Sequence, residues 1–587
     1  MMKETPQRRF EFDWLRVLAI LIVYLYHSTR FFNLGDWHVK NAHTYLWVEM
    51  WNVFAMTWLM PLFFIISGAS LFYALGKTSS FKKFYADKFL RLMIPVVVAT
   101  VSHSAVQVYL ERVTHGRFLG SFFSFLPEYL NGVYIGIGEQ GNFAFAGMHL
   151  WYLLFLYVYS LMCYSLFVWF KNNGRTVLDR ITTFLALPGL MFLCFPLPLF
   201  LMKAFIPGII LSVGAGAWGF LYYLWFLVAG FLIVSSELLQ KNIIQQRWIS
   251  LVLGICLSVA YLYMCFGPSH PLSPDGYSHW SRTIIYFFSA WCWLFAILGF
   301  GIRLLAFDHP WLPKANEGVL PFYILHQSVL VVIGFFVVRW EINALLKWGV
   351  VFTSALLTIL ILYSGLIKRS DLLRFLFGMK TSRPFFDIFR KNVSVLILHL
   401  FYAGLIAIAI MTAAQNRTPM PLTYDPATDI LLTSDSITAR SVSGVDVVYD
   451  SDAVSGRAIR FSAGANPQTQ LHPNVFVEMQ FSAPAGLYQV WLRGKSDDNE
   501  WTDSVWLQVD DHIETQAKSV RMGNWRDIYP AGVYAWAGDG ATPVPIALTT
   551  TGDHNLRIQP RQTPHRIDQV WFSRYQVRIP DTVEPIR

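Results

Sequence analysis

The stretch FDWLRVLAILIVYLYHSTRFF, residues Phe12–Phe32, decides the fold class of this chain. Its length matches the roughly 20 apolar residues that a helix needs to cross a bilayer, yet it contains Asp13, Arg16 and His27. Ionisable side chains in hydrocarbon are costly and by default mark functional sites. Spacings of three and eleven residues put these side chains on one face of a helix, with Arg16 and His27 about 16 Å apart along its axis. The stretch therefore predicts a membrane helix whose polar face meets other parts of the chain.

The composition of the chain is that of a multi-pass membrane protein. Of its 587 residues, 55% are hydrophobic, 17% aromatic and only 14% charged, a balance typical of polytopic proteins. The net charge of +9 comes from cations in short loops between apolar runs, so it indicates membrane topology and no nucleic-acid partner. The five cysteines all lie in or beside apolar runs, and no Cys/His cluster indicates a metal site.

Apolar runs of about 20 residues predict a helical bundle of ten core spans followed by an eleventh. The predicted spans are 12–32, 50–75, 89–110, 148–170, 181–201, 218–235, 249–266, 281–305, 317–337, 347–367 and 393–413. Lys and Arg concentrate in alternate loops, and the positive-inside rule then places the N-terminus in the cytoplasm. An odd number of spans places everything after the eleventh on the outer side.

The chain divides into four predicted parts. Residues 1–370 form the ten-span domain, and 371–392 form a basic amphipathic segment on the cytoplasmic membrane surface. Residues 393–413 form the eleventh span, and 414–587 form an outer domain. Short runs of alternating polarity in this domain, such as LYQVWLRG and SVWLQVDD, predict antiparallel strands. Several such strands without a long helical pattern favour a β-sandwich or jelly roll.

Three cations gather at the predicted cytoplasmic mouth of the bundle. Arg16 lies in the first turns of the first span, and Lys88 and Arg91 open the third span in KFLRLMIP. Together they suit a phosphorylated ligand that arrives from the cytoplasm. The alternative interpretation is that these side chains anchor the spans at the membrane surface.

Three histidines lie at compatible depths in the predicted bundle. His27 sits in the outer half of the first span, where a neutral imidazole suits a general base for a hydroxyl. His149 opens the fourth span and His326 lies in the middle of the ninth. The alternative is a buried histidine that bonds to a neighbouring helix. In the second span, Ser67 and Gly68 of MPLFFIISGAS favour either close helix packing or a hydroxyl that faces a cavity.

Five short motifs, in one order, resemble the membrane acyltransferase-3 family. They are the D-x-x-R-x10-H arrangement of Asp13, Arg16 and His27, MPLFFIISG at 60–68, KFLRLMIP at 88–95, HLWYL at 149–153 and YILHQ at 323–327. The resemblance covers residues 10–370. It implies a bacterial inner-membrane enzyme that moves an acetyl or succinyl group from cytoplasmic acyl-CoA to a hydroxyl of an envelope glycan. It implies no tightly bound cofactor, since acyl-CoA is a substrate.

The resemblance also implies roles for individual residues. His27 would be the catalytic histidine, Arg16, Lys88 and Arg91 would bind the donor, and His149 and Trp151 would line the acceptor side. Beside these, we predict Asp13 as a second catalytic residue and His326 and Ser67 as further acceptor-side residues. Lys88 stands where the family often has Arg, and lysine binds phosphate as a point charge and not as a fork. Two other functions stay open: a carbohydrate exporter or flippase, and an envelope sensor with a sugar-binding outer domain. The sequence does not indicate the oligomeric state.

The outer domain resembles jelly-roll carbohydrate-binding modules in GLYQVWLRGK, DSVWLQVDD and RIDQVWF. The resemblance implies that exposed aromatic side chains stack on sugar rings. The predicted residues are Trp501, Trp525, Tyr529 and Trp536. The opposite interpretation is that such aromatics form the core of the sandwich. Asp568 is predicted to be structural, the alternative being a calcium ligand.

Overall fold

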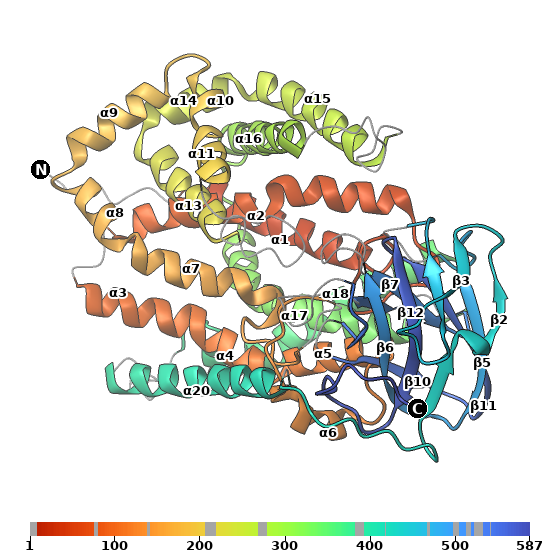
Figure 1. Cartoon of the computed structure of the whole chain (residues 1–587). Helices are drawn as coiled ribbons and strands as arrows, with labels where there is room; N and C mark the ends of the chain where they lie inside the picture. The colour runs from red at the N-terminus through yellow and green to blue at the C-terminus, as the bar shows by residue number, and fades with distance from the viewer. Residues whose placement is uncertain are drawn as a thin grey trace, which may run out of the picture. The chain divides into compact units, whose positions relative to one another are not determined.

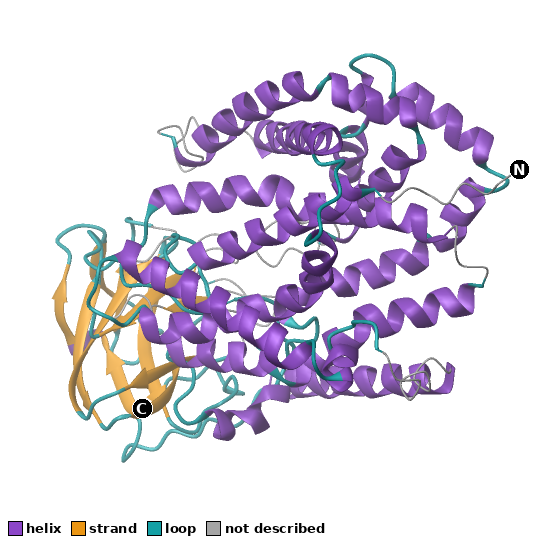
Figure 2. Cartoon of the chain, turned by 180° about the vertical axis from the view of Figure 1, so that it is seen from behind, coloured by secondary structure: helices purple, strands orange, loops and turns teal. Residues whose placement is uncertain are grey.

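The computed structural model of the chain describes residues 9–75, 80–137, 141–205, 219–267, 279–381, 392–416, 418–465, 470–496, 504–511, 518–521, 532–539 and 542–587. The chain forms two compact units. One comprises Met1–Gln107, Ile135–Ile137 and Ala144–Ala403, and the other comprises Val108–Tyr134, Gly138–Phe143 and Gly404–Arg587. Long helices dominate the first unit, and all the described strands belong to the second (Figure 1, Figure 2).

The predicted first span is one uninterrupted helix, α1 (Phe10–Thr29). The helices that follow in the first half of the chain are α2 (Leu46–Leu75), α3 (Phe81–Lys88), the π-helix η1 (Phe89–Met93), α4 (Ile94–Val101), α5 (His103–Thr114), α6 (Phe122–Phe125), η2 (Leu126–Leu130), η3 (Met148–Leu150), α7 (Trp151–Met162), α8 (Tyr164–Lys171), α9 (Arg175–Leu185), α10 (Leu190–Cys194) and α11 (Leu197–Phe205). Those of the second half are α13 (Phe220–Ser235), α14 (Glu237–Gln245), α15 (Arg247–Phe266), α16 (His279–Leu304), α17 (Leu312–Val337), α18 (Ala344–Ile361), η4 (Leu362–Ile367), α19 (Asp371–Leu376) and α20 (Asn392–Asn416).

Six of the described helices are long and apolar enough to cross a membrane, and four sharply bent pairs raise the number to ten. Helix α1 is not among these ten, because Glu11, Asp13 and Arg16 lie in its first two turns. The predicted span 181–201 is wrong as a single straight helix, since the chain turns by 106° between α9 and the segment α10–α11. Much of the neighbouring apolar segment 202–217 lies outside the described residues.

The predicted amphipathic segment 371–392 is helical over less of its length than expected. Helix α19 has six residues and ends just before Gly378, whose φ of +66° is the left-handed conformation that stops a helix. A Cβ on Gly378 would lie 2.4 Å from the carbonyl oxygen of Arg91, so this turn lies directly against η1. Most of the remaining residues, 382–391, lie outside the described part of the chain.

Helices α1 and α17 lie side by side and point in the same direction. Arg16 of α1 bonds to Asn316 of α17, and His27 bonds to His326, eleven residues further along α1 and ten further along α17. Matching steps in the same sense can occur only between parallel helices. The polar face predicted for the first span therefore contacts α17 at both Arg16 and His27, and Arg16 also bonds to Ser70 of α2.

Two glycines bring α2 and α13 into backbone contact. A Cβ on Gly68 would lie 1.9 Å from the carbonyl oxygen of Leu227, and a Cβ on Gly230 would lie 2.1 Å from that of Ile65. Small residues at such positions let membrane helices approach closely. Of the two roles predicted for this segment, close packing is the one that Gly68 has.

We expect Gly68→Ala to destabilise the helical unit by about 1–3 kcal/mol, because a rigid carbonyl cannot move away from the added methyl group. The measurement is the thermal unfolding midpoint of the purified protein together with its abundance in membranes. Gly349→Ala in α18 is the matched control, since a Cβ there meets nothing within 4 Å. Equal midpoints for the two variants would contradict the packing role.

The second unit contains two antiparallel sheets that share one core. Its strands are β1 (Ile430–Thr433), β2 (Ile437–Arg440), β3 (Val445–Tyr449), β4 (Arg457–Phe461), β5 (Val477–Ala483), β6 (Gly486–Ser496), β7 (Ser504–Val509), β8 (Lys518–Arg521), β9 (Ala535–Ala537), β10 (Val544–Leu548), β11 (Gly552–Pro560) and β12 (His565–Ser573). One sheet has the order β10-β6-β12-β4-β3, with β1 and β9 paired at its side, and the other has the order β2-β5-β11-β7-β8. Alternate residues of both sheets form the buried core, so the predicted sandwich is confirmed.

A second cluster of buried aromatics covers the other face of the first sheet. Trp491, Trp536 and Trp571 pack with Ile579 and Ile586. Their indole N–H groups donate to the carbonyl oxygen of Gln576, the carbonyl oxygen of Glu584 and the carboxylate of Asp429, respectively. Trp536 is only 1% exposed, so its prediction as a sugar-stacking residue is wrong. The other three predicted aromatics, Trp501, Trp525 and Tyr529, lie outside the described residues.

Buried ion pairs hold the centre of this sheet. Asp568 is 1% exposed, pairs with Arg493 and accepts a hydrogen bond from the backbone N–H of Val454 at 3.0 Å. These contacts correspond to the structural role predicted for Asp568. Nearby, Asp450 accepts hydrogen bonds from Lys495 at 3.0 Å and from Arg566 at 2.7 Å.

The pKa of Asp450 makes the stability of this sheet depend on pH. Burial alone would raise this pKa, but the hydrogen bonds from Lys495 and Arg566 outweigh it and lower the pKa from 3.8 to about 2. A folded-state pKa below the unfolded value means that the carboxylate contributes fully above pH 3.8 and loses its contribution as the pH falls toward 2. We therefore expect Asp450→Asn to destabilise the sheet near neutral pH.

The measurement is hydrogen exchange of β4 and β12 amides in the full-length protein, corrected for the intrinsic effect of pH on exchange. The difference between Asp450→Asn and the parent should shrink as the pH is lowered through this window. Asp446→Asn is the control, because Asp446 is exposed on neighbouring β3. A difference that stays constant down to pH 2 would refute the assignment.

Candidate active site

Three histidines from three separate segments meet inside the helical unit. His27 comes from α1, His149 from η3 and His326 from α17. Nδ1 of His27 lies 2.8 Å from Nε2 of His326. The ring centroid of His149 lies 4.8 Å from that of His326 and 6.3 Å from that of His27. His326 is fully buried and His149 nearly so, whereas His27 is half-buried.

The backbone carbonyl of Tyr323 sets the tautomers of this cluster. It lies 2.7 Å from Nδ1 of His326, and because a carbonyl can only accept, Nδ1 carries the proton. In the neutral ring Nε2 of His326 is then an acceptor, so His27 donates to it from Nδ1. The remaining nitrogen of His27, Nε2, is left with its lone pair and has no hydrogen-bond partner among the described residues. Nε2 of His27 is therefore free to accept a hydrogen bond or a proton.

His149 also bonds to the carbonyl oxygen of Tyr323. Its Nε2 lies 2.8 Å from the Tyr323 oxygen, so this nitrogen donates and Nδ1 keeps the lone pair. In return, the Tyr323 hydroxyl donates to the carbonyl oxygen of His149. Nδ1 of His149 is buried and has no partner among the described residues. Two imidazoles of the cluster thus present basic nitrogens, and one backbone oxygen orients both.

A loop after α1 places an indole ring against the cluster. The ring of Trp37 stacks on His27 with centroids 5.6 Å apart and an interplanar angle of 20°. The Arg30 guanidinium also packs over the Trp37 ring, at 4.9 Å, and donates to the carbonyl oxygen of Asp36 at 2.5 Å. Lys40 closes the loop by donating to the carbonyl oxygens of Arg30 and Gly35. Burial, and next the charge of Arg30, lower the pKa of the Lys40 amine to about 7.

The other end of the α1–α17 pair holds the predicted cations. Arg16 donates to Asp13 at 3.2 Å, to Asn316 at 3.0 Å and to Ser70 at 2.9 Å. Asn316 also donates to Asp13 at 3.0 Å. These bonds hold the guanidinium in one orientation and leave Asp13 about 21 Å from His27 along α1, at the ~1.5 Å rise per residue of a helix. Asp13, predicted to be catalytic together with His27, thus contacts Arg16 and Asn316 and lies far from His27, and its catalytic role stays a prediction.

The two remaining cations belong to the same region. Lys88 and Arg91 lie at the start of the bent span, on α3 and η1, and Arg91 lies within electrostatic reach of both Lys88 and Arg16. The Lys88 amine also packs over the ring of Phe84 at 5.4 Å. The predicted cation cluster thus assembles from α1, α3 and η1.

The predicted acceptor-side residues Ser67 and Trp151 stand one layer away from the histidines. The Ser67 hydroxyl bonds to that of Tyr152 at 2.6 Å, and the ring of Tyr152 contacts Tyr323 edge-on. Trp151 packs against the rings of Tyr223 and Phe155. Neither side chain contacts His27 in the described structure, and both support residues that surround the cluster.

A buried polar chain, absent from the sequence prediction, extends from the cluster. His38, adjacent to Trp37, contacts the amide of Gln327, which donates to Gln107 at 3.1 Å. Gln107 donates to Ser328 at 2.7 Å, and Ser328 bonds to Nδ1 of His103 at 2.7 Å. Little in the sequence indicates these residues. Gln327 ends the YILHQ motif, but His38 and His103 lie in no motif.

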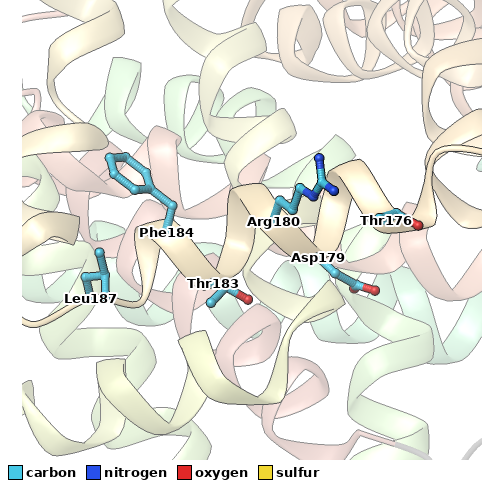
Figure 3. A pocket seen from close by; sticks show the side chains of 6 residues that line it. All are labelled: Thr176, Asp179, Arg180, Thr183, Phe184 and Leu187. Carbon is cyan, nitrogen blue, oxygen red and sulfur yellow. The ribbon is translucent and has the colours of Figure 1, made fainter.

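One surface hollow lies apart from these groups. It has a volume of about 500 Å³ and follows helix α9 (Figure 3). Its lining consists of Thr176, Asp179, Arg180, Thr183, Phe184 and Leu187. Asp179 already pairs with Arg175 one turn earlier, at 3.1 Å. No histidine of the cluster takes part, and we assign no site to it.

Comparison with known proteins agrees with this geometry. Residues 9–367 match the acyltransferase-3 family, described as an acyltransferase domain. Glucans biosynthesis protein C of Escherichia coli strain K12 is 23% identical over 389 residues, which are 64% of this chain and 95% of that protein. The protein of the same name from E. coli O157:H7 gives the same values. The chain belongs to the acyltransferase-3 family of membrane acyltransferases, which confirms the resemblance predicted from its five motifs.

Solved structures add less. An exo-β-1,3-galactanase from Phanerochaete chrysosporium aligns with 26% of this chain and 30% of its own, at 15% identity and a TM-score of 0.19. A GH26-CBM35 β-(1,4)-mannanase from Podospora anserina aligns with 27% of this chain and 29% of its own, at 12% identity and a TM-score of 0.18. Likenesses at such scores carry no weight for fold or function.

The tautomers derived above can be measured. In ¹⁵N-histidine spectra of the purified protein, His27 should carry its proton on Nδ1 and show an unprotonated Nε2. We expect His326→Phe to abolish this preference, because Phe removes the acceptor that holds the Nδ1 proton. Assignment by His27→Gln identifies the resonance. A His27 protonated on Nε2 in the parent protein would overturn the order of donors and acceptors.

Proposed function

We propose that this chain is a membrane O-acyltransferase that moves an acetyl or succinyl group from cytoplasmic acyl-CoA to a hydroxyl of an envelope glycan. The observation that carries the proposal is the ordered pair His27–His326, anchored at 2.7 Å on the Tyr323 carbonyl. A general base must present a lone pair to the proton it removes. The order of donors in this cluster leaves that lone pair on Nε2 of His27.

The cation cluster supports an acyl-CoA donor. Arg16, Lys88 and Arg91 concentrate positive charge at one end of the α1–α17 pair, where phosphate groups would be held. His27 lies about 16 Å further along α1, at the ~1.5 Å rise of a helix. An extended pantetheine arm has a comparable length, so the thioester would reach His27 while the phosphates stay at the cations. In this proposal the cations face the cytoplasm and His27 faces the outer side of the inner membrane.

The glycan acceptor is supported by the relative named glucans biosynthesis protein C. His27 would take the proton of the sugar hydroxyl, the oxygen would attack the thioester carbonyl, and the proton would pass to the departing thiolate. In a second route, Nε2 of His27 attacks the thioester first and then passes the acyl group to the sugar. The outer β-sandwich would bind the glycan, with Trp501, Trp525 and Tyr529 as the proposed stacking residues.

The test is acyl transfer by purified full-length protein in proteoliposomes. Labelled acetyl-CoA and succinyl-CoA are supplied in separate reactions with gluco-oligosaccharides, and labelled sugar is separated from free acid. We expect transfer by the parent protein, none by His27→Ala, and a loss of at least about 100-fold for His326→Phe, because a misoriented imidazole is a poor base.

His399→Phe provides the matched control. His399 of α20 stacks on Phe89, with ring centroids 4.3 Å apart, and bonds to the carbonyl oxygen of Val395, outside the cluster. It should therefore keep the parent rate. Full transfer by His27→Ala would exclude the proposed base, and movement of oligosaccharide across the membrane without any transfer of label would favour a flippase instead.

A further inference from the structure

Two N–H groups in the segment beside His27, the indole of Trp37 and Nε of Arg30, have no hydrogen-bond partner among the described residues. His27 donates to His326, and both His326 and His149 donate to the Tyr323 carbonyl. The indole N–H of Trp37 is different: it is buried with a side chain only 5% exposed, and it has no hydrogen-bond partner among the described residues. Indole N–H can only donate. The ring that carries this donor is the one that stacks on His27.

An unpaired buried donor is normally avoided, because it loses its bond to water and gains nothing in return. Trp37 is nevertheless held firmly where it is. Its backbone N–H donates to the Asp36 carboxylate at 2.8 Å, and Arg30 both packs over its ring and bonds to the Asp36 carbonyl. Arg30 is itself 6% exposed. The loop thus stacks a ring with an unpaired donor on the His27 imidazole and packs a buried positive charge over that ring.

Acyl transfer is faster when a hydrogen-bond donor stabilises the oxyanion that forms during the reaction. When a sugar oxygen, or His27 itself, bonds to the thioester carbon, the carbonyl oxygen becomes an oxyanion. Preorganised donors that face this oxygen stabilise the transition state more than the ground state. The oxyanion forms beside Nε2 of His27 in either route, and the ring of Trp37 stacks on that imidazole.

We propose that the indole N–H of Trp37 is the oxyanion donor of this site, with Arg30 supporting it through positive potential. The assignment rests on the acyltransferase function proposed above. As the sugar oxygen bonds to the carbonyl carbon, its proton moves to Nε2 of His27 and the carbonyl oxygen takes the negative charge and accepts from Trp37. When the C–S bond breaks, the carbonyl re-forms, the thiolate leaves and takes the proton from His27.

The test is Trp37→Phe in the full-length protein, assayed with acetyl-CoA, succinyl-CoA and gluco-oligosaccharides. Phe retains a ring for stacking on His27 but lacks the N–H. We expect kcat to fall about 100-fold while KM for both substrates stays near the parent value, because the lost bond exists only in the transition state. Binding of an S-alkyl-CoA thioether, which lacks the carbonyl, should be unchanged.

Trp291→Phe is the matched control. The indole N–H of Trp291 is also buried and without a partner among the described residues, but its ring contacts are with Phe195, Phe226 and Phe295. Its replacement should leave kcat unchanged. If Trp37→Phe lowers the amount of folded protein, replacement of Trp37 with 3-benzothienyl-alanine, which exchanges the N–H for sulfur at almost constant shape, gives the same test.

The outcomes separate the two proposals. Loss of kcat in both Trp37 variants, with the control intact, supports the oxyanion donor. A parent-like kcat in the Trp37 variants overturns it and leaves the acyltransferase function standing. A loss on Tyr26→Phe alone would also overturn it, since Tyr26 is the other aromatic whose ring contacts His27. Absence of transfer by the parent protein overturns the function, and the Trp37 assignment falls with it.

Discussion

The hydrogen bond from His27 to His326 is the interaction on which the site depends, and its direction comes from one backbone oxygen. The Tyr323 carbonyl accepts from both His326 and His149. A carbonyl cannot exchange its role as acceptor, whereas an imidazole can present either nitrogen as donor. Because the Tyr323 carbonyl can only accept, it fixes which nitrogen of each imidazole carries the proton. His27 and His149 are then each left with one nitrogen that keeps its lone pair.

In the reaction that we propose, the helix pair that carries this bond also separates donor binding from proton transfer. Because α1 and α17 are parallel, the contact of Arg16 with Asn316 and that of His27 with His326 lie at opposite ends of one interface. Phosphate binding and proton transfer make opposite demands: the first needs fixed positive charge, and the second needs a neutral base. Charge near the base would weaken it by disfavouring its protonation. A length of helix keeps Arg16, Lys88 and Arg91 away from His27, whereas Arg30, which packs over the Trp37 ring, lies close to the base.

In the second unit, the buried polar groups stabilise the fold and have no proposed chemical role. Asp568 and Arg493 pair inside the sheet, and Trp491, Trp536 and Trp571 place their N–H groups on backbone or carboxylate oxygens. All of these donors are satisfied, whereas the N–H of Trp37 in the helical unit is not. Other indole N–H groups of the helical unit, such as that of Trp291, are also buried without a partner among the described residues. Trp37 differs from them because its ring stacks on His27.

The sequence by itself determined the class of the chain: apolar length indicated the membrane helices, alternation indicated the sandwich, and the cost of Asp13, Arg16 and His27 in a membrane helix located the site. These properties are local, because helix rise and strand alternation depend only on near neighbours. Only the tertiary structure decided the partners. It paired Asp13 with Arg16 and not with His27, joined His27 to a histidine 299 positions away, buried Trp536 and brought Trp37 onto the imidazole. Such pairings come from the packing of helices and loops that are distant in sequence, and the spacing of residues along a single helix carries no information about them.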